Sequence, residues 1–176
     1  LGSSLDKLYN LVLNQRIMDH LEATNNLHEA QQGFRPGRSA ADNIFMLRTC
    51  LDARKHNKLD TYILFLDIEK AYDRVWRAGL LWHLWQKDIK GKMFRVLANM
   101  TDNTPSRVLH NGAFSHTIRP DLGWEQGDTL ATTMFNVFID GALQQVWQQN
   151  PGIPIPANGT TTSWTKLVAL MYADDL

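Results

Sequence analysis

Apolar residues recur at helical spacing along much of the chain. Leucine, isoleucine and valine fall three or four residues apart between positions 5 and 21, a pattern that predicts an amphipathic helix. A second helix is predicted from Ser39, whose side chain can cap a helix N-terminus, to about His56. Ile44, Leu47 and Leu51 are expected to form its inward face.

The same spacing predicts three further helices. They begin after Asp73, beyond Gly91 and near Asp128. The first of them has a broad apolar stripe, formed by Trp76, Leu80 and Leu84 and by Leu81 and Trp85. We expect Trp82 and Trp85 in the core rather than as base-stacking platforms.

Short extended segments lie between and after these helices. Asn111-Gly112 separates two β-favouring runs and is a strong signal for a two-residue hairpin. Thr61–Leu66 and Lys166–Met171 are apolar without alternation, so each predicts a strand buried on both faces, whereas Pro151–Pro156 predicts a surface loop. Helices mixed with antiparallel strands indicate the α+β class rather than a doubly wound parallel sheet.

Composition adds a size and a charge pattern. With 176 residues, 44% of them hydrophobic, the chain has the size of one domain and enough apolar residues for a core. The formal net charge of zero offers no support for a histone-like or polybasic nucleic-acid binder. Residues 1–100 contain fifteen basic and eleven acidic residues, net +4, and the rest contain three and seven, net −4. This asymmetry suggests a basic clamp and an acidic, metal-holding centre, with ordinary surface charge as the alternative.

The remaining composition excludes several classes. The single cysteine, Cys50, rules out an internal disulfide framework and a multi-cysteine zinc site. The sequence has no apolar run of about 18 residues and no charged leader before an apolar block, so neither a membrane span nor a secretion signal is predicted. Because the chain begins with Leu1 and stops just after an acidic pair, we expect it to be a piece of a longer protein.

Acidic residues follow both predicted buried strands. Asp67 comes directly after one of them, and Asp174 with Asp175 follows the other. If the two strands are neighbours, these carboxylates meet and repel, and a bound cation would relieve the repulsion. Oxygen ligands select Mg²⁺ or Mn²⁺, and two such ions about 3.5 to 4 Å apart serve phosphoryl or nucleotidyl transfer. A purely structural role for the paired aspartates is left open by this reasoning.

Four segments together resemble the motifs of reverse transcriptases. They are, in chain order, QQGFRPGRSAADNI at 31–44, FLDIEKAYDRV at 65–75, QGDTLATTMFN at 126–136 and YADD at 172–175. Their order and intervals fit the family, and the resemblance covers roughly positions 5 to 176. The sequences GFRPGRS and EKAYDRV are most similar to those of the reverse transcriptases of non-LTR, LINE-type retrotransposons.

The resemblance implies roles for the acidic residues and their neighbours. Asp67 and Asp174 match the metal-binding aspartates, and Asp175 is the partner acid. The backbone carbonyl of Ile68 would be a further metal ligand. Tyr72 matches the aromatic residue beneath the incoming sugar, where a ring leaves no volume for a 2′-hydroxyl.

Nucleotide-binding residues and an architecture are implied as well. Gln126 and Gly127 match the segment that touches the nucleotide and template, while Arg35 and Arg38 match a fingers loop whose guanidinium groups grip phosphates. The implied fold is a polymerase palm, a ferredoxin-like antiparallel sheet with packed helices, joined to helical fingers. We expect fingers over residues 1–60 and an incomplete palm over 61–176, which stops after the catalytic hairpin turn.

The implied activity is RNA-directed DNA synthesis by two Mg²⁺ or Mn²⁺ ions. An RNA template, a DNA primer and deoxynucleoside triphosphates would be the partners, with no membrane. A thumb and a possible endonuclease region would belong to the parent polyprotein. Since a returning strand and thumb normally follow the YADD turn, we expect little polymerase activity from these residues alone. A retrotransposon origin would make the protein intracellular, in the nucleus or cytoplasm.

Two alternatives remain at this point. A viral-type RNA polymerase is compatible with the five residues between Asp67 and Asp73 and with Asn136, although Tyr72 argues against it. A catalytically inactive retroelement relic that binds nucleic acid is the other. Glu125, where the family often has a basic residue, favours weaker template binding.

Overall fold

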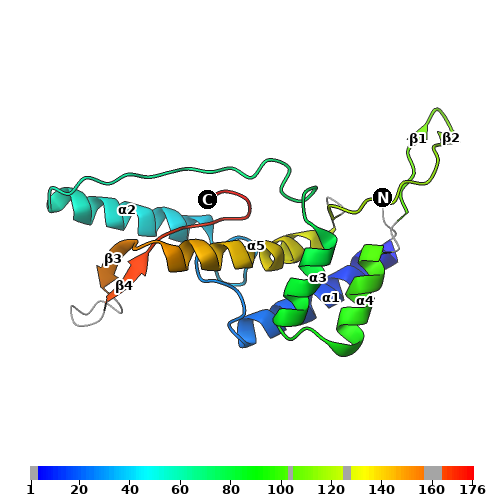
Figure 1. Cartoon of the computed structure of the whole chain (residues 1–176), viewed down its shortest axis with the longest axis horizontal. Coiled ribbons are helices and arrows are strands. Elements are labelled where there is room, and N and C mark those ends of the chain that lie inside the picture. Colours follow the sequence, from blue (N-terminus) through cyan, green and yellow to red (C-terminus); the bar gives the residue numbers. More distant parts are fainter. Residues whose placement is uncertain (1–3, 103–104, 125–127, 157–163) are drawn as a thin grey trace. The chain divides into compact units, whose positions relative to one another are not determined.

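The computed structural model describes residues 4–102, 105–124, 128–156 and 164–176 (Figure 1). Helices dominate these residues, and two small antiparallel sheets accompany them, so the predicted α+β class is confirmed at that level. The elements are α1 (Ser4–Ala23), α2 (Ala40–His56), α3 (Arg77–Gln86), α4 (Gly91–Asp102), β1 (Leu109–His110), β2 (Ala113–Phe114), α5 (Thr129–Gln149), β3 (Ile153–Pro156) and β4 (Trp164–Leu167).

The chain divides into two compact units. The first comprises residues 1–26 and 70–138, and the second comprises residues 27–69 and 139–176. Helix α5 contributes its first half to one unit and its second half to the other.

In the first unit, α1, α3, α4 and the start of α5 enclose an apolar core. Leu21, Leu80, Leu84, Leu97 and Leu130 are fully buried there. Polar contacts supplement the packing: the Thr133 hydroxyl donates to Asn14 Oδ1 at 2.6 Å, and His20 Nε2 bonds the Lys87 carbonyl at 2.9 Å. The core therefore fixes α1 against segments that follow it by more than 60 residues.

The predicted hairpin is confirmed in this unit. β1 and β2 pair with Leu109 opposite Phe114, and Asn111 and Gly112 both have positive φ, of 49° and 79°. Such angles are those of a two-residue turn whose twist matches the flanking strands, and asparagine followed by glycine tolerates them best.

The tryptophans of α3 correct a prediction. Trp82 and Trp85 are exposed, because α3 turns Leu80 and Leu84 inward instead. Trp85 packs edge-on against Phe94 of α4, with ring centroids 5.2 Å apart. The helix is short and apolar on most sides, so periodicity correctly placed Leu80 and Leu84 inward but did not limit the width of the buried stripe.

In the second unit, α2 begins as predicted. Ser39 and Asp42 form a capping box in which each side chain accepts from the other residue's backbone N–H. The predicted inward face is wrong at Ile44, which is exposed, whereas Cys50 is buried and burial raises the pKa of its thiol.

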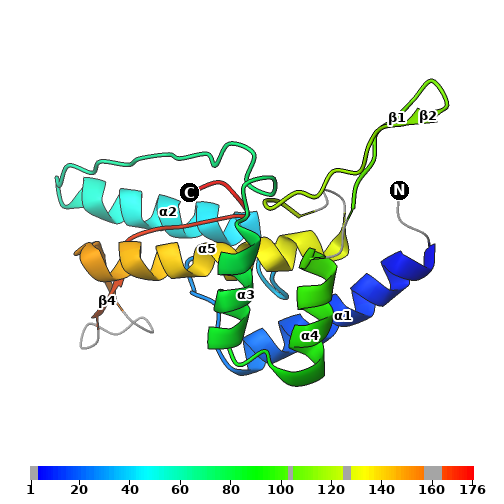
Figure 2. The same ribbon diagram turned by 45° about the vertical axis from the view of Figure 1, so that its right-hand side comes forward.

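The segment after α2 also differs from its prediction. Residues 59–66 are extended and run back along α2 in both views (Figures 1 and 2), but their side chains are exposed, 94% for Tyr62 and 75% for Phe65. Among the described residues no strand pairs with 61–65, so the apolar run lacks the neighbours that would bury it. Leu66 is the exception, because it exchanges two backbone hydrogen bonds with Leu176.

The last predicted strand is shifted, and the predicted proline loop is a strand. β4 ends at Leu167 and pairs with β3, with Ile153 opposite Leu167 and Pro154 opposite Lys166. Prolines are tolerated because, among the residues that the structure describes, β3 pairs with a strand on one side only. Lys166 Nζ donates to the Asn150 carbonyl at 2.5 Å and ties this hairpin to the end of α5.

None of the helices within the described ranges combines the length and the apolar character needed to cross a membrane.

A histidine in the second unit makes stability depend on pH. The ring of His28 lies against Trp147, and its Nδ1 accepts from the Ala30 N–H. The backbone N–H of His28 donates to Asp140 Oδ1. Burial lowers the pKa of the His28 ring below 6.5, although the Asp140 carboxylate opposes this shift.

We expect acidification to destabilise the second unit through His28. Since the unfolded chain takes up the proton more readily than the folded one, stability falls as pH drops below about 6.5, by at most about 1.4 kcal/mol per pH unit for one proton. Urea unfolding between pH 7.5 and 5.5 measures this dependence. His28→Gln, which keeps an acceptor but does not titrate, should weaken it, and an identical pH profile for both proteins would contradict the assignment.

Candidate functional site

The acidic turn near the end of the chain is a two-residue hairpin turn. Tyr172 and Asp175 exchange backbone hydrogen bonds of 2.9 and 3.2 Å, with Ala173 and Asp174 between them. Ala173 has φ 61°, a left-handed conformation that usually belongs to glycine at this position of a hairpin. The backbone at the turn is therefore strained, and the surrounding contacts must maintain it.

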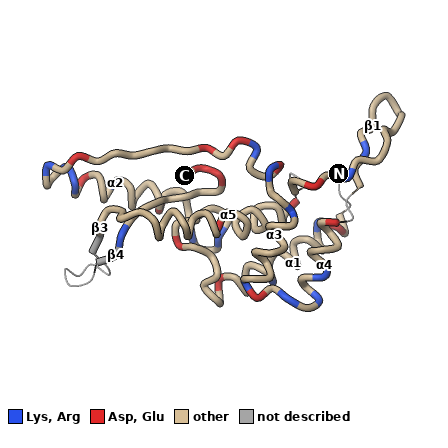
Figure 3. The backbone as a smooth tube through the Cα atoms, in the orientation of Figure 1, with Lys and Arg blue, Asp and Glu red and all other residues tan. Residues whose placement is uncertain are grey.

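Asp67 lies beside this turn. Leu66 and Leu176 exchange hydrogen bonds of 2.7 and 2.9 Å, and the next pair in the antiparallel register is Asp67 opposite Asp175. This is a non-hydrogen-bonded pair, the type in which side chains approach most closely, with Cβ atoms about 4.5 to 5.5 Å apart. The structure thus pairs two aspartates that are 108 positions apart in the sequence. Figure 3 shows the acidic positions of the two segments in red on a mostly tan tube.

The first loop of the second unit, residues 27–39, contacts the other side of the turn. Gln31 and Met171 form a parallel bridge, framed by the Gln32 N–H donating to the Met171 carbonyl and the Met171 N–H donating to the Ala30 carbonyl, both at 2.8 Å. Asn43 of α2 also donates to the Met171 carbonyl, at 3.1 Å. The turn is consequently fixed between this loop and the end of the extended segment.

The side chain of Gln31 contacts the turn directly. Its Nε2 donates to the Ala173 carbonyl at 3.0 Å, and its Oε1 accepts from the N–H groups of Ala173 and Gly33 at 3.1 and 2.8 Å. Only 1% of Gln31 is exposed. Gln31 opens the motif segment 31–44, and this place is the signal for it in the sequence, although the resemblance implied no role for it.

The two predicted phosphate-binding arginines lie on the same loop. Arg35 is 5% exposed, and its Nη1 donates to the carbonyls of His28 and Gln31 at 3.0 and 3.1 Å. Arg38 is more exposed and grips both carboxylate oxygens of Glu29, at 2.7 and 3.0 Å, which lowers the pKa of Glu29. Arg35 therefore supports the loop, and Arg38 is the guanidinium closer to solvent.

Tyr72 belongs to the first unit. Its ring lies 5.4 Å from that of Phe135, and its carbonyl accepts from the Trp124 N–H at 3.1 Å. The Trp124 indole donates in turn to Asp128, at 2.8 Å, just before α5 begins. Gln126 and Gly127 fall between these anchors and lie outside the described residues.

The donor atoms at the turn suit an oxygen-ligated cation. No group of three or more His, Cys, Asp or Glu side chains that could hold a metal occurs in the ranges that the structure describes. Mg²⁺ does not require such a cage, because proteins commonly bind it through one or two carboxylates together with substrate phosphates and water. The backbone pairing places Asp67 opposite Asp175, and Asp174 is adjacent in sequence, so the turn offers carboxylates of this kind, although these three do not themselves form such a group.

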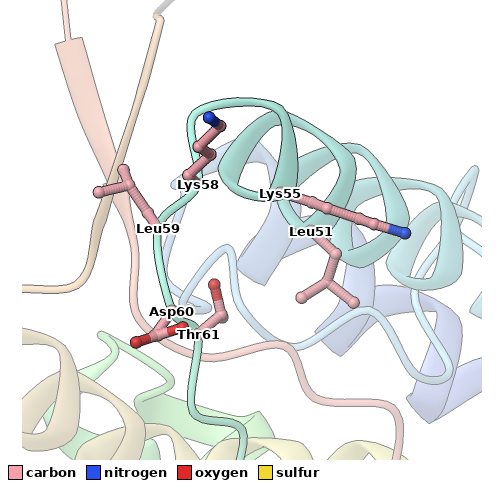
Figure 4. A pocket seen from close by; sticks show the side chains of 6 residues that line it. All are labelled: Leu51, Lys55, Lys58, Leu59, Asp60 and Thr61. Atoms are coloured by element: carbon pink, nitrogen blue, oxygen red, sulfur yellow. The ribbon is translucent and has the colours of Figure 1, made fainter.

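A hollow at the end of α2 carries positive charge. Lys55 and Lys58 line it together with Leu51, Leu59, Asp60 and Thr61, and Figure 4 shows these side chains around the α2 C-terminus. Arg54 of α2 donates to the hydroxyl of the lining residue Thr61 at 2.6 Å. The two lysines are exposed and available to anions.

Known proteins with similar sequences come from mobile elements. The chain is 29% identical to the retrovirus-related Pol polyprotein from type-1 retrotransposable element R2 of Popillia japonica, over 100% of the chain and 24% of that protein. It is 25% identical to the probable RNA-directed DNA polymerase from transposon BS of Drosophila melanogaster, over 99% of the chain and 18% of the relative. The RNA-directed DNA polymerase from mobile element jockey of Drosophila funebris is also 25% identical, over 77% of the chain and 15% of the relative.

These matches confirm the resemblance to the reverse transcriptases of non-LTR retrotransposons. The chain spans about a quarter or less of the length of these relatives. The sequence profile of the family described as reverse transcriptase (RNA-dependent DNA polymerase) matches residues 1–176. The chain therefore belongs to the reverse transcriptase family.

Proposed function

We propose that the chain forms part of the catalytic core of an RNA-directed DNA polymerase. The observation that carries the proposal is the antiparallel pairing of Asp67 with Asp175 beside the Tyr172–Asp175 turn. In a member of this family, such a pair offers the oxygen donors that nucleotidyl transfer requires. The substrates would be an RNA template, a DNA primer and deoxynucleoside triphosphates.

The acidic residues would hold two Mg²⁺ or Mn²⁺ ions. Asp67 and Asp174 are the proposed ligands, with the Ile68 carbonyl as a further oxygen donor and Asp175 as the partner acid. When bound, the ions would activate the primer 3′-hydroxyl and stabilise the charge that develops on the leaving pyrophosphate. The protein itself would keep these carboxylates close together although their charges repel. The backbone pairing on both sides of the turn supports this role.

The remaining residues would bind and orient the substrates. Tyr72 would lie beneath the incoming sugar, and Gln126 with Gly127 would contact the nucleotide and template. Arg38 would face phosphates, with the buried Arg35 supporting its loop from within, while Lys55 and Lys58 would add salt-sensitive backbone contacts.

The proposed architecture assigns residues 1–60 to fingers and 61–176 to a ferredoxin-like palm. The short hairpins and the extended segment after α2 are compatible with a palm whose sheet includes further strands of the parent polyprotein. A thumb and an endonuclease region would lie elsewhere in that polyprotein.

Primer extension distinguishes the proposed activity from the viral-type RNA polymerase and from the inactive relic. On an RNA template, the longest available protein that contains these 176 residues should extend a DNA primer with deoxynucleotides and discriminate against ribonucleotides. Tyr72→Ala, which removes the ring that excludes the 2′-hydroxyl, should raise the ratio of ribonucleotide to deoxynucleotide incorporation about tenfold or more.

The contrary outcomes are distinct. A preference for ribonucleotides in the unmodified protein would favour the viral-type RNA polymerase. Binding of nucleic acid without any extension would favour the inactive relic. Tyr72→Phe keeps the ring and is the matched control, with the unmodified ratio expected.

A further inference from the structure

We propose that Gln31 is a positioning residue, whose side-chain amide holds the Ala173 peptide in its left-handed conformation and so sets the direction of the Asp174 carboxylate. This inference rests on the proposed function, because it concerns how the same site is kept in order. It assigns to the first loop of the second unit a task at the acidic turn that is separate from phosphate binding.

The hydrogen bonds of Gln31 are directed at one residue of the turn. Nε2 donates to the Ala173 carbonyl at 3.0 Å and Oε1 accepts from the Ala173 N–H at 3.1 Å. A primary amide is neutral and carries a donor and an acceptor side by side. It can therefore bond both backbone polar groups of Ala173, as a neighbouring strand would. Oε1 uses its second lone pair for the Gly33 N–H, at 2.8 Å.

Ala173 needs such support because of its backbone. With φ at 61° it adopts a conformation that residues other than glycine seldom occupy unless their surroundings impose it. Both polar groups of its backbone are bonded to the same buried side chain, which is 1% exposed. Releasing that side chain would let the residue relax toward ordinary φ values.

Relaxation at Ala173 would be transmitted to Asp174. The two residues are consecutive and form the whole turn between the Tyr172 and Asp175 hydrogen bonds. A change of φ and ψ at the first turn residue rotates the second relative to Asp67, which is fixed by the Leu66–Leu176 pair. Gln31 therefore acts on the proposed metal ligand without touching substrate or metal.

Gln31→Met tests this role in the extension-competent parent polymerase. Methionine keeps the volume of glutamine and removes both hydrogen bonds to Ala173. We expect kcat for deoxynucleotide incorporation to fall about tenfold, with little change in the nucleotide KM, and the Mg²⁺ concentration for half-maximal activity to rise. Gln31→Glu, which as a carboxylate accepts but cannot donate, would set a buried negative charge against the Ala173 carbonyl and should give a loss at least as large.

Gln32→Met is the matched control. Gln32 is also buried and belongs to the same loop, but its Nε2 donates at 2.7 Å to the Glu29 carbonyl rather than to the turn. It should leave the Mg²⁺ dependence unchanged. Equal Mg²⁺ dependence for the Gln31 and Gln32 variants, with the unmodified enzyme active, would overturn the inference.

A suppressor separates positioning from a general loss of folding. Ala173→Gly removes the cost of positive φ, so the loss caused by Gln31→Met should shrink in that background. An undiminished loss would refute coupling through Ala173. Inactivity of the unmodified polymerase would instead contradict the proposed function, so the two failures are distinguishable.

Discussion

Asp67→Asn should reduce primer extension by about 10³-fold or more. Asparagine has nearly the same volume as aspartate but lacks the charge that would bind a divalent cation, and removing one such ligand forfeits several kcal/mol of transition-state stabilisation. Single-nucleotide incorporation by the longest available protein containing these residues measures the effect. Asp174→Asn should cause a loss of similar size, and extension equal to that of the unmodified enzyme in either variant would contradict the metal assignment.

Two controls sharpen this experiment. Asp73→Asn removes an exposed carboxylate only six residues along the chain and should leave deoxynucleotide incorporation nearly unchanged. Without metal, Asp67→Asn should be at least as heat-stable as the unmodified protein, because one of two facing like charges is gone. Mg²⁺ should then raise the melting temperature of the unmodified protein more than that of the variant. A variant that melts earlier without metal would indicate a structural role for Asp67.

Local signals predicted much of the secondary structure. The helix cap formed by Ser39 and Asp42 depends only on residues within a few positions of each other, and so does the turn formed by Asn111 and Gly112. Such features can therefore be predicted from the local sequence. Burial was predicted less well. The apolar run 61–66 and the face of α3 both depend on what packs beside them, which periodicity does not specify.

The residues of the candidate site also divide into those that the sequence predicts and those that depend on tertiary contacts. Asp67, Asp174 and Asp175 could be predicted from the sequence because two apolar runs each end in acid and because these residues match the reverse transcriptase motifs. Gln31 was missed because its role exists only through contact with a residue 142 positions away. Chemistry can be inferred from residue type, whereas support of that chemistry requires the tertiary structure.

Gly33→Ala should damage the acidic turn more than any other single methyl group added to this loop. A Cβ at Gly33 would lie 2.2 Å from the Ala173 nitrogen and 2.9 Å from its Cα. Because these are backbone atoms, held by Gln31 on one side and by Tyr172 and Asp175 on the other, the clash must shift the turn itself. We expect the free energy of unfolding to fall by about 1–3 kcal/mol.

The effect of Gly33→Ala on incorporation should exceed its effect on stability, because a displacement of about 1 Å at a catalytic group can cost about 10²-fold in rate. Gly37→Ala is the control within the same loop. Gly37 has φ 70° and nothing within 4 Å of a new Cβ, so its substitution carries the cost of positive φ, about 1 kcal/mol, but leaves the turn untouched. Primer extension and urea unfolding of both variants decide the matter: if Gly33→Ala retains as much activity as Gly37→Ala, the loop does not control the geometry of the acidic turn.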